Sequence, residues 1–175
     1  MLTRSEIIRL VFSGDIKIDP FELSRLGPNS YDLTLGNKLL IYKDECLDPK
    51  IDNPSEELII PSEGLVLKPG VLYLGSTVEK TGSSYYVPIL HGRSSAARLG
   101  ITTHLSAGFG DLGWFGAWTL ELMTLHKVRI YPGMSLCQVA FEPVTGEILQ
   151  GYTGRYQDQT GVTTSRAWID SLGAK

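Results

Sequence analysis

The sequence predicts a mainly β domain that begins with one short helix. Short apolar segments recur between residues 58 and 141, and glycine, proline or asparagine punctuation separates most of them. A helical spacing of apolar residues occurs only near the N-terminus, and no internal repeat of fixed period is present. Many short strands joined by turns, with almost no helix, are typical of a β-sandwich or a barrel-like all-β domain.

The N-terminal helix is marked at both ends. Thr3 is a good N-cap and Glu6 completes a capping box, while Leu2 and Ile7 are placed for a hydrophobic staple. A short apolar stripe follows, and Ser13-Gly14-Asp15 ends it. Because the helix is short, we expect it to dock on a sheet rather than stand alone.

Strand-like patterns follow the helix. Residues 31–35 alternate, Gly36-Asn37 provides a turn, and residues 38–42 continue, so these two segments are predicted to pair as a hairpin. Further strands are expected at the apolar segments 58–60, 71–78, 85–90, 101–105, 114–125, 128–131 and 134–141.

The last part of the chain has a different texture. From Gly151 to Gly161 it is polar, glycine-spaced and poor in core-forming residues. We therefore divide the chain into a β-domain over residues 1–150 and a C-terminal tail or lid over residues 151–175. A frayed terminus is one interpretation of that composition. The tail also carries arginines and aromatic residues that suit a segment ordering over a ligand, namely Tyr152, Arg155, Tyr156, Arg166 and Trp168.

Composition excludes several classes of function. The 175 residues carry 16 basic and 19 acidic side chains, so the chain lacks the basic balance that gripping long nucleic acids requires. No apolar run approaches the roughly 20 residues that span a bilayer, and the start lacks the apolar core of a signal peptide. Cys46 and Cys137 lie far apart, which fits a reducing compartment. We expect a cytoplasmic protein that binds neither nucleic acid nor membrane, with any phosphate ligand small and met by a few arginines.

The segment from His91 to Gly100 holds the first candidate site. A predicted strand leads into Gly92-Arg93-Ser94-Ser95, and Arg98 follows five residues after Arg93. Serine hydroxyls and free backbone N–H groups at a strand-to-helix turn can bind phosphate oxygens, and arginine adds bidentate, charge-assisted bonds. The structural alternative is a serine-rich helix N-cap with two surface arginines.

Two carboxylates mark further candidates. Asp111 lies in a glycine-rich turn before Trp114, where it could hold a sugar hydroxyl beside an aromatic wall or shape the turn as an Asx-turn. Glu121 interrupts an apolar strand, and alternation puts it on the face opposite Leu120 and Leu122. If that face lines a pocket, desolvation would raise the pKa of this carboxyl toward the range useful for proton transfer. The alternative for Glu121 is a solvent-facing strand surface.

Together, these segments resemble the deoxycytidine triphosphate (dCTP) deaminase family, which shares its fold with the trimeric dUTPases. The resemblance covers nearly the whole chain. Its motifs are residues 29–37, Gly92-Arg93-Ser94-Ser95 with Arg98-Leu99-Gly100, Asp111 with Thr119-Leu120-Glu121, Pro132-Gly133-Met134, and residues 155–161 with Ser165-Arg166. It implies a dUTPase-like β-barrel or distorted jelly roll that assembles as a homotrimer with sites at subunit interfaces.

The resemblance also implies roles for individual residues. Glu121 would be the catalytic acid and base, Asp111 would hold the deoxyribose, and the tail would close over the nucleotide. The implied substrate-binding residues are Arg93, Ser94, Ser95, Ala96, Ala97, Arg98, Asp111, Thr119, Leu120, Gln138, Tyr152, Arg155 and Gln159. Mg²⁺ would accompany the triphosphate, and no metal held by the protein itself is implied. The family often has a branched apolar residue before the aspartate and a proline after it, so Gly110 and Leu112 predict a looser turn here.

The implied reaction is deamination of dCTP to dUTP and ammonia without zinc. Zinc deaminases use His-x-Glu and Pro-Cys-x-x-Cys, and the histidines and cysteines of this chain show no such clustering. Residues 108–116 also resemble the dUTPase motif whose aspartate helps activate water, which favours the members that continue to dUMP and diphosphate in the same site. The alternatives are a dUTP pyrophosphatase alone and a non-catalytic nucleotide-binding β-module.

Overall fold

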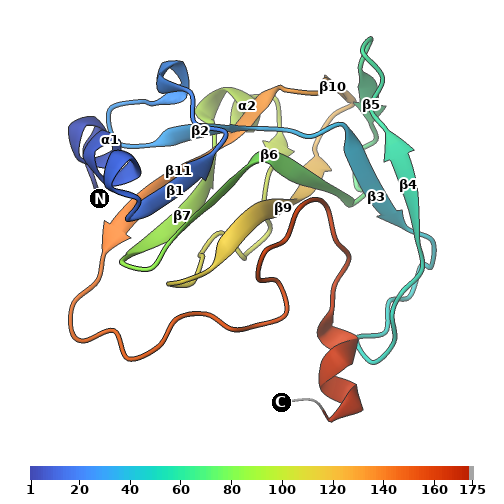
Figure 1. The fold of residues 1–175 in the computed structure, drawn as a ribbon. Coiled ribbons are helices and arrows are strands. Elements are labelled where there is room, and N and C mark those ends of the chain that lie inside the picture. The colour runs from blue at the N-terminus through green and yellow to red at the C-terminus, as the bar shows by residue number, and fades with distance from the viewer. Residues whose placement is uncertain (174–175) are drawn as a thin grey trace.

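The computed structural model describes residues 1–173 and is mainly β, as predicted (Figure 1). Its helices are α1 (Arg4–Ser13), α2 (Ser94–Arg98) and the 3-10 helices η1 (Leu23–Arg25) and η2 (Ala167–Leu172). Its strands are β1 (Ile16–Asp19), β2 (Tyr31–Thr34), β3 (Lys38–Tyr42), β4 (Ser55–Ile59), β5 (Leu65–Leu67), β6 (Tyr73–Ser83), β7 (Tyr86–Gly92), β8 (Ile101–Thr102), β9 (Phe115–Thr124), β10 (Val128–Ile130) and β11 (Ser135–Pro143). Within residues 1–173, no helix combines the length and the apolar character that crossing a membrane requires.

The strands form sheets that pair antiparallel. The largest sheet has the order β4-β3-β6-β9-β8, and β1 pairs with the C-terminal end of β6. A second sheet has the order β2-β11-β7, and β5 and β10 form a two-stranded ribbon. The long strands β6, β9 and β11 have neighbours on both edges.

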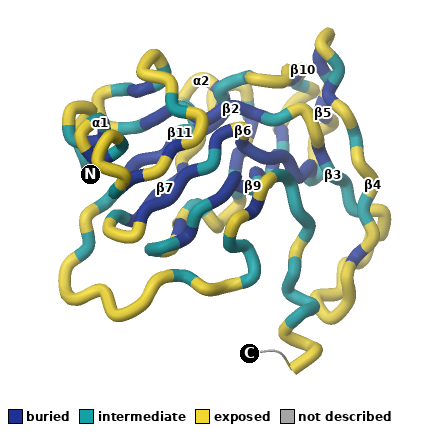
Figure 2. The backbone as a smooth tube through the Cα atoms, in the orientation of Figure 1, coloured by how far each residue is buried: buried dark blue, intermediate teal, exposed yellow. Residues whose placement is uncertain are grey.

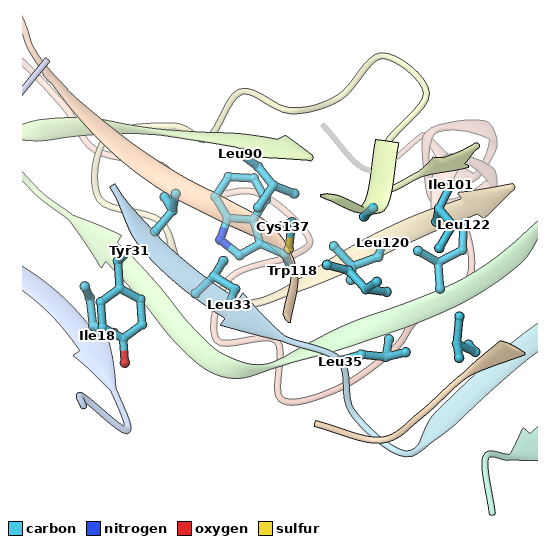
Figure 3. Close-up of a cluster of buried hydrophobic side chains, with 14 of the residues drawn as sticks. Ile18, Tyr31, Leu33, Leu35, Leu90, Ile101, Trp118, Leu120, Leu122 and Cys137 are labelled. Carbon is cyan, nitrogen blue, oxygen red and sulfur yellow. The ribbon is translucent and has the colours of Figure 1, made fainter. Parts of the chain in front are cut away.

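The hydrophobic core lies between the three-stranded sheet and the largest sheet. Leu33 of β2, Leu90 of β7 and Cys137 of β11 belong to the same buried cluster as Trp118 and Leu120 of β9 (Figure 3). Burial raises the pKa of the Cys137 thiol, so this residue acts as a small neutral core side chain. Figure 2 shows these central strands buried and the chain after β11 mostly exposed or half-buried.

The N-terminal helix is confirmed, but its predicted capping box is wrong. Helix α1 begins after Thr3 and ends at Gly14, whose φ of 84° lies in the left-handed region that favours glycine. The Thr3 hydroxyl contacts the Ser5 hydroxyl at 3.2 Å and makes no capping bond. Glu6 pairs with Arg9 at 2.6 Å, one turn further along. The ion pair therefore takes the carboxylate that the capping box required.

The predicted hairpin over residues 31–42 is also wrong. Strand β2 pairs with β11, whereas β3 pairs with β4 and β6. Leu35 forms a bridge with Thr77, and the Gly36 N–H donates to the Ser76 carbonyl at 2.8 Å. The chain therefore crosses from one sheet to the other at the predicted turn. Residues 35 and 36 pair there with β6, and a hairpin of residues 31–42 would not allow that pairing.

Glu79, at a bulge in β6, links the largest sheet to the three-stranded sheet by hydrogen bonds. The pairing register shifts between Ser76 and Lys80, and the Glu79 side chain is 1% exposed. Its carboxylate accepts hydrogen bonds from the N–H and the hydroxyl of Thr34, each at 2.8 Å, and from Arg25 at 3.1 Å. A buried carboxylate is tolerated when partners of this kind replace water. Sequence patterns did not indicate this contact, because it joins residues 45 and 54 positions apart.

Candidate active site

A cavity of about 520 Å³ opens beside β9. Its walls come from β9, the loop that precedes β9, strand β3 and the C-terminal tail. The described residues that line it include two carboxylates and no lysine or arginine. The predicted site residues that meet in this cavity are Asp111, Thr119, Glu121, Tyr152 and Gln159.

Glu121 lies in the wall of the cavity, as the strand alternation predicts. Leu120 and Leu122 are fully buried on the opposite face, while Glu121 is half-buried. Its Oε2 accepts a hydrogen bond from the Leu105 N–H at 3.0 Å, and its own N–H donates to the Thr103 carbonyl at 3.2 Å. Its Oε1 has no protein partner within residues 1–173. One carboxylate oxygen is therefore fixed by the loop, and the other is available to a ligand.

Asp111 lies at the cavity rim beside an aromatic wall. The Trp114 N–H donates to the Asp111 carbonyl at 3.3 Å, and Gly113 has a φ of 81° in this turn. Trp114 packs edge-on against Trp118 with ring centroids 4.8 Å apart, and both rings line the cavity. The Asp111 carboxylate makes no hydrogen bond in the described part of the chain, so the Asx-turn interpretation has no bond to support it. The arrangement fits a group that holds a sugar hydroxyl.

The C-terminal tail runs past the start of β9 (Figure 1). Its residues Tyr152, Tyr156 and Gln159 line the cavity. The Asp158 N–H donates to the Phe115 carbonyl at 2.9 Å. The Gln159 amide nitrogen donates to the Ala117 carbonyl at 3.0 Å and to the Thr119 hydroxyl at 2.7 Å. Both donors of Gln159 are therefore engaged by β9. The described part of the tail is hydrogen-bonded to the β-domain rather than frayed, and positions 174 and 175 lie outside the described residues.

The end of the tail is tied to the connection between β3 and β4. The Ser165 N–H donates to the Tyr42 hydroxyl at 2.9 Å, and the Ser171 hydroxyl donates to the Lys50 carbonyl at 3.1 Å. Arg155 forms an ion pair with Asp170 within the tail itself. Arg155 is not among the residues that line the cavity, although the family resemblance places it on the nucleotide.

The remaining predicted residues lie on another part of the same chain, which we call the arginine face. It consists of Arg93, Ser94, Ser95, Arg98 and Gln138. No member lines the cavity. The two serines are exposed, and their hydroxyls have no hydrogen-bond partner between residues 1 and 173. The N-cap of α2 is Arg93 and makes no side-chain capping bond, so the serine N-cap of the structural alternative does not form.

The other predicted binding residues beside these groups are small or buried. Ala96 is 3% exposed and Leu120 is 0% exposed, so their side chains face the core. Either residue could meet a ligand only through its backbone. Ala97 is exposed on α2 next to the arginine face.

The structure adds Asp32, a residue that the sequence analysis did not single out. Its Oδ2 lies 3.2 Å from Nη2 of Arg93. Burial raises the pKa of Asp32, and the guanidinium groups of Arg93 and Arg25 act in the opposite direction. Gln138 lies opposite Asp32 in the sheet and accepts a hydrogen bond from the Ser30 hydroxyl at 2.9 Å. The alternation of β2, with buried neighbours on either side of Asp32, was the signal that could have found it.

No group of three or more histidine, cysteine, aspartate or glutamate side chains in the described chain is arranged to hold a metal ion. A catalytic zinc requires about three such protein ligands. Mg²⁺ usually keeps several waters and binds through one or two carboxylates and substrate phosphates, so it does not require such a group.

Comparison with known proteins identifies relatives over nearly the whole chain. The profile of a family described as dCTP deaminase-like matches residues 1–144. A protein of Clostridium botulinum strain Eklund 17B, named dCTP deaminase, dUMP-forming, is 48% identical over 170 residues, which cover 97% of this chain and 98% of that one. A protein of Cytophaga hutchinsonii with the same name is 48% identical over 157 residues, covering 90% and 91%.

A solved structure has the same fold. The crystal structure of the 2'-deoxycytidine 5'-triphosphate deaminase from Agrobacterium tumefaciens matches with a TM-score of 0.64 at 21% identity. The match covers 82% of this chain and 48% of that chain, so the present chain spans about half of its length. At this identity the likeness concerns the fold alone.

Proposed function

This chain belongs to the dCTP deaminase-like family, and from that premise we propose that it deaminates dCTP and then cleaves the resulting dUTP to dUMP and diphosphate in the same site. The names of its relatives support both steps. The observation that carries the proposal is the placement of Glu121, which presents one unengaged carboxylate oxygen to the cavity beside Asp111 and the tail. A dUTP pyrophosphatase alone would have no need of a proton-transfer group on this cavity wall.

In the proposed first step, Glu121 moves the protons. Its carboxylate takes one proton from the water whose oxygen bonds to C4 of cytosine and passes that proton to N3. It then takes the second proton from the new C4 hydroxyl and passes it to the departing amine. The C4–N bond then breaks, so that dCTP and water give dUTP and ammonia. Positioned proton transfer accounts for about 10²–10⁴-fold, and orientation and hydrogen bonds supply the remainder.

In the proposed second step, Asp111 acts on the phosphate side. It holds the deoxyribose during deamination and then orients the water that cleaves dUTP. Mg²⁺, when bound with the nucleotide, neutralises phosphate charge, and its ligands are mainly phosphate oxygens and water. We place both steps in the cytoplasm, a location that two unpaired cysteines fit.

We also infer that two subunits build each site. Among the described residues, the cavity lining supplies carboxylates and an aromatic wall but no lysine or arginine, whereas a triphosphate requires cations. The arginine face supplies cations and free hydroxyls but no cavity. A homotrimer of dUTPase-like jelly rolls would bring the arginine face of one subunit to the cavity of the next, as a head-to-tail interface in a closed ring allows.

The test is product analysis with a Glu121→Gln variant. Purified protein is incubated with dCTP and Mg²⁺, and ammonia, dUTP and dUMP are measured separately. We expect the wild type to release ammonia and dUMP, and the variant to lose about 10²–10⁴-fold in ammonia release while still binding dCTP. The matched control is Glu63→Gln, which changes an exposed carboxylate outside the cavity.

Each outcome selects one function. Ammonia release that survives Glu121→Gln would show that Glu121 is not the base. Diphosphate from dUTP without ammonia from dCTP would select a pyrophosphatase. Ammonia with dUTP as the final product would select a one-step deaminase.

A further inference from the structure

The outer face of the three-stranded sheet carries a row of polar side chains next to Arg93. Asp32 of β2 lies opposite Gln138 of β11, and Gln138 lies opposite His91 of β7. Residues directly opposite each other in antiparallel strands share a face of the sheet. The neighbouring Leu33 is fully buried on the core side, so the polar row faces away from the core.

Arg93 follows β7 and reaches across this row. Its Nη2 lies 3.2 Å from Oδ2 of Asp32, and the two side chains are 37% and 26% exposed. The pair is therefore partly shielded from water, unlike a freely solvated surface pair. Within residues 1–173, Asp32 is the ion-pair partner of the guanidinium, and the guanidinium donates no hydrogen bond. An arginine paired at one nitrogen keeps its N–H donors for a second anion, in the fork geometry that suits phosphate.

Asp32 stands where its charge is costly. Burial is the largest influence on its pKa and raises it, and it outweighs the lowering by Arg93 and Arg25. The folded state therefore disfavours the charged form relative to an exposed aspartate. Groups with this property gather at functional sites, whereas an asparagine would fill the same space without the desolvation of a charge.

We propose that Asp32 is a positioning residue for the nucleotide triphosphate, because it holds the Arg93 guanidinium with its free donors turned toward the phosphate oxygens. The inference rests on the proposed function, which makes the triphosphate the ligand of the arginine face. Ordering Arg93 before the ligand arrives removes that part of the entropy cost from binding. Asp32 does not touch the substrate, and its whole effect passes through Arg93.

The negative charge of Asp32 also repels phosphate, and this opposing effect is the weaker one. The guanidinium stands between the carboxylate and the phosphate, so the attraction acts over a shorter distance than the repulsion. Coulomb energy falls with distance, and the ion pair already neutralises most of the field of the carboxylate. Loss of Asp32 is therefore expected to weaken binding rather than strengthen it.

The test compares Asp32→Ala, Arg93→Ala and the double variant by steady-state kinetics with dCTP. We expect Asp32→Ala to raise KM about tenfold and to change kcat by less than about twofold. Without Asp32, the Arg93 side chain is ordered only when the substrate binds, so that entropy cost weakens binding. In the Arg93→Ala background, the loss of Asp32 should raise KM no further. Asp32→Glu should recover part of the lost affinity. Glu57→Ala, which removes the exposed ion pair with Lys38, is the matched control and should leave KM unchanged.

Thermal unfolding separates positioning from a structural role. Because the folded pKa of Asp32 is raised, its charged form lowers stability at neutral pH, and this contribution disappears as the pH falls below the ordinary aspartate range. Asp32→Asn should therefore keep or raise the Tm at pH 7 while KM increases. An unchanged KM in Asp32→Ala, an additive effect in the double variant, or a fall in Tm that accompanies the rise in KM would each overturn the proposal.

Direct titration with dCTP distinguishes this inference from the proposed function. A wild type that binds dCTP without releasing ammonia would refute the proposed function, and the Asp32 inference would then be judged by the dissociation constants of the same variants. A wild type that does not bind dCTP would overturn both.

Discussion

The cavity beside β9 and the arginine face are opposite in chemistry and in construction. The cavity combines two carboxylates with an aromatic wall, and loops and the tail hold its parts together. The arginine face combines two guanidinium groups with two unbonded hydroxyls on strand ends and a one-turn helix. Only the cavity depends on the tail, and only the arginine face carries the charge that a triphosphate requires.

This difference teaches that neither region is a complete site for a nucleotide. Proton transfer at a base requires a carboxylate in the cavity wall such as the half-buried Glu121. Phosphate binding requires cations such as Arg93 and Arg98 in reach of several anionic oxygens. On the proposed function, separation of the two regions would let each residue type keep the environment that suits it until a nucleotide bound to both.

The largest expected effect is recovery of activity when two inactive variants are mixed. Glu121→Gln damages the cavity, and Arg98→Ala damages the arginine face at an exposed side chain. If each site takes its two regions from different subunits, random assembly leaves about a quarter of the sites intact, so about a quarter of wild-type ammonia release should return. The measurement is ammonia release after the two variants are refolded together.

The control mixes Glu121→Gln with Asp111→Asn. Both changes lie in the cavity, so every site keeps one defect and activity should stay at the level of the separate variants. If the first mixture also stays inactive while mass spectrometry shows mixed assemblies, both regions of a site belong to one chain, and the two-subunit proposal fails.

Local patterns predicted the cavity better than they predicted the pairing of strands. The alternation around Glu121 placed its side chain correctly because the period of two is a property of the strand itself. The break at Gly36 was also predicted, but its partner in β6 was not, since Ser76 lies 40 positions away and nothing local selects it. The ion pair of Asp32 and Arg93 was unpredictable for the same reason. Asp32 lies in β2 and Arg93 directly follows β7, and these two strands are brought together by β11, which lies between them.

The partners of charged side chains were the least predictable feature where an oppositely charged residue lies close by. Glu6 was expected to complete a capping box with Thr3 and instead pairs with Arg9, because the i,i+3 geometry offers a full positive charge. The contact of Arg155 with Asp170 follows from the conformation of the tail, which the residue pattern does not specify. The assignment of Arg155 to the nucleotide stays a prediction.

A smaller effect is expected from Gln159→Ala, which tests whether the tail belongs to the cavity. The change removes the bonds to Ala117 and Thr119, each worth about 1 kcal/mol. We expect KM for dCTP to rise about tenfold and the tail to be cleaved faster by protease. Gln157→Ala is the matched control, since Gln157 bonds to Gly113 outside the cavity.

The outcome with the control decides what Gln159 does. Gln157→Ala should speed cleavage of the tail without a comparable rise in KM. Equal effects of both variants on KM would mean that a closed tail matters and that the contact of Gln159 with β9 does not. If Gln159→Ala does not change the rate at which protease cleaves the tail, other contacts hold the tail on the β-domain.

The smallest expected effect comes from Asp170→Asn, which removes the ion pair of Arg155 and leaves its hydrogen bond to the Arg166 carbonyl. The two side chains are 28% and 65% exposed, and ion pairs this open to solvent contribute little to stability. We expect the Tm to change little, tail cleavage to speed up by less than about fivefold, and KM to change by less than about threefold. Added salt should produce the same change in the wild type and little in the variant, because screening weakens the exposed pair. A rise in KM of tenfold or more would instead show that Asp170 orients Arg155 for the nucleotide, and the tail would then carry a charge-positioning pair of the same kind as Asp32 and Arg93.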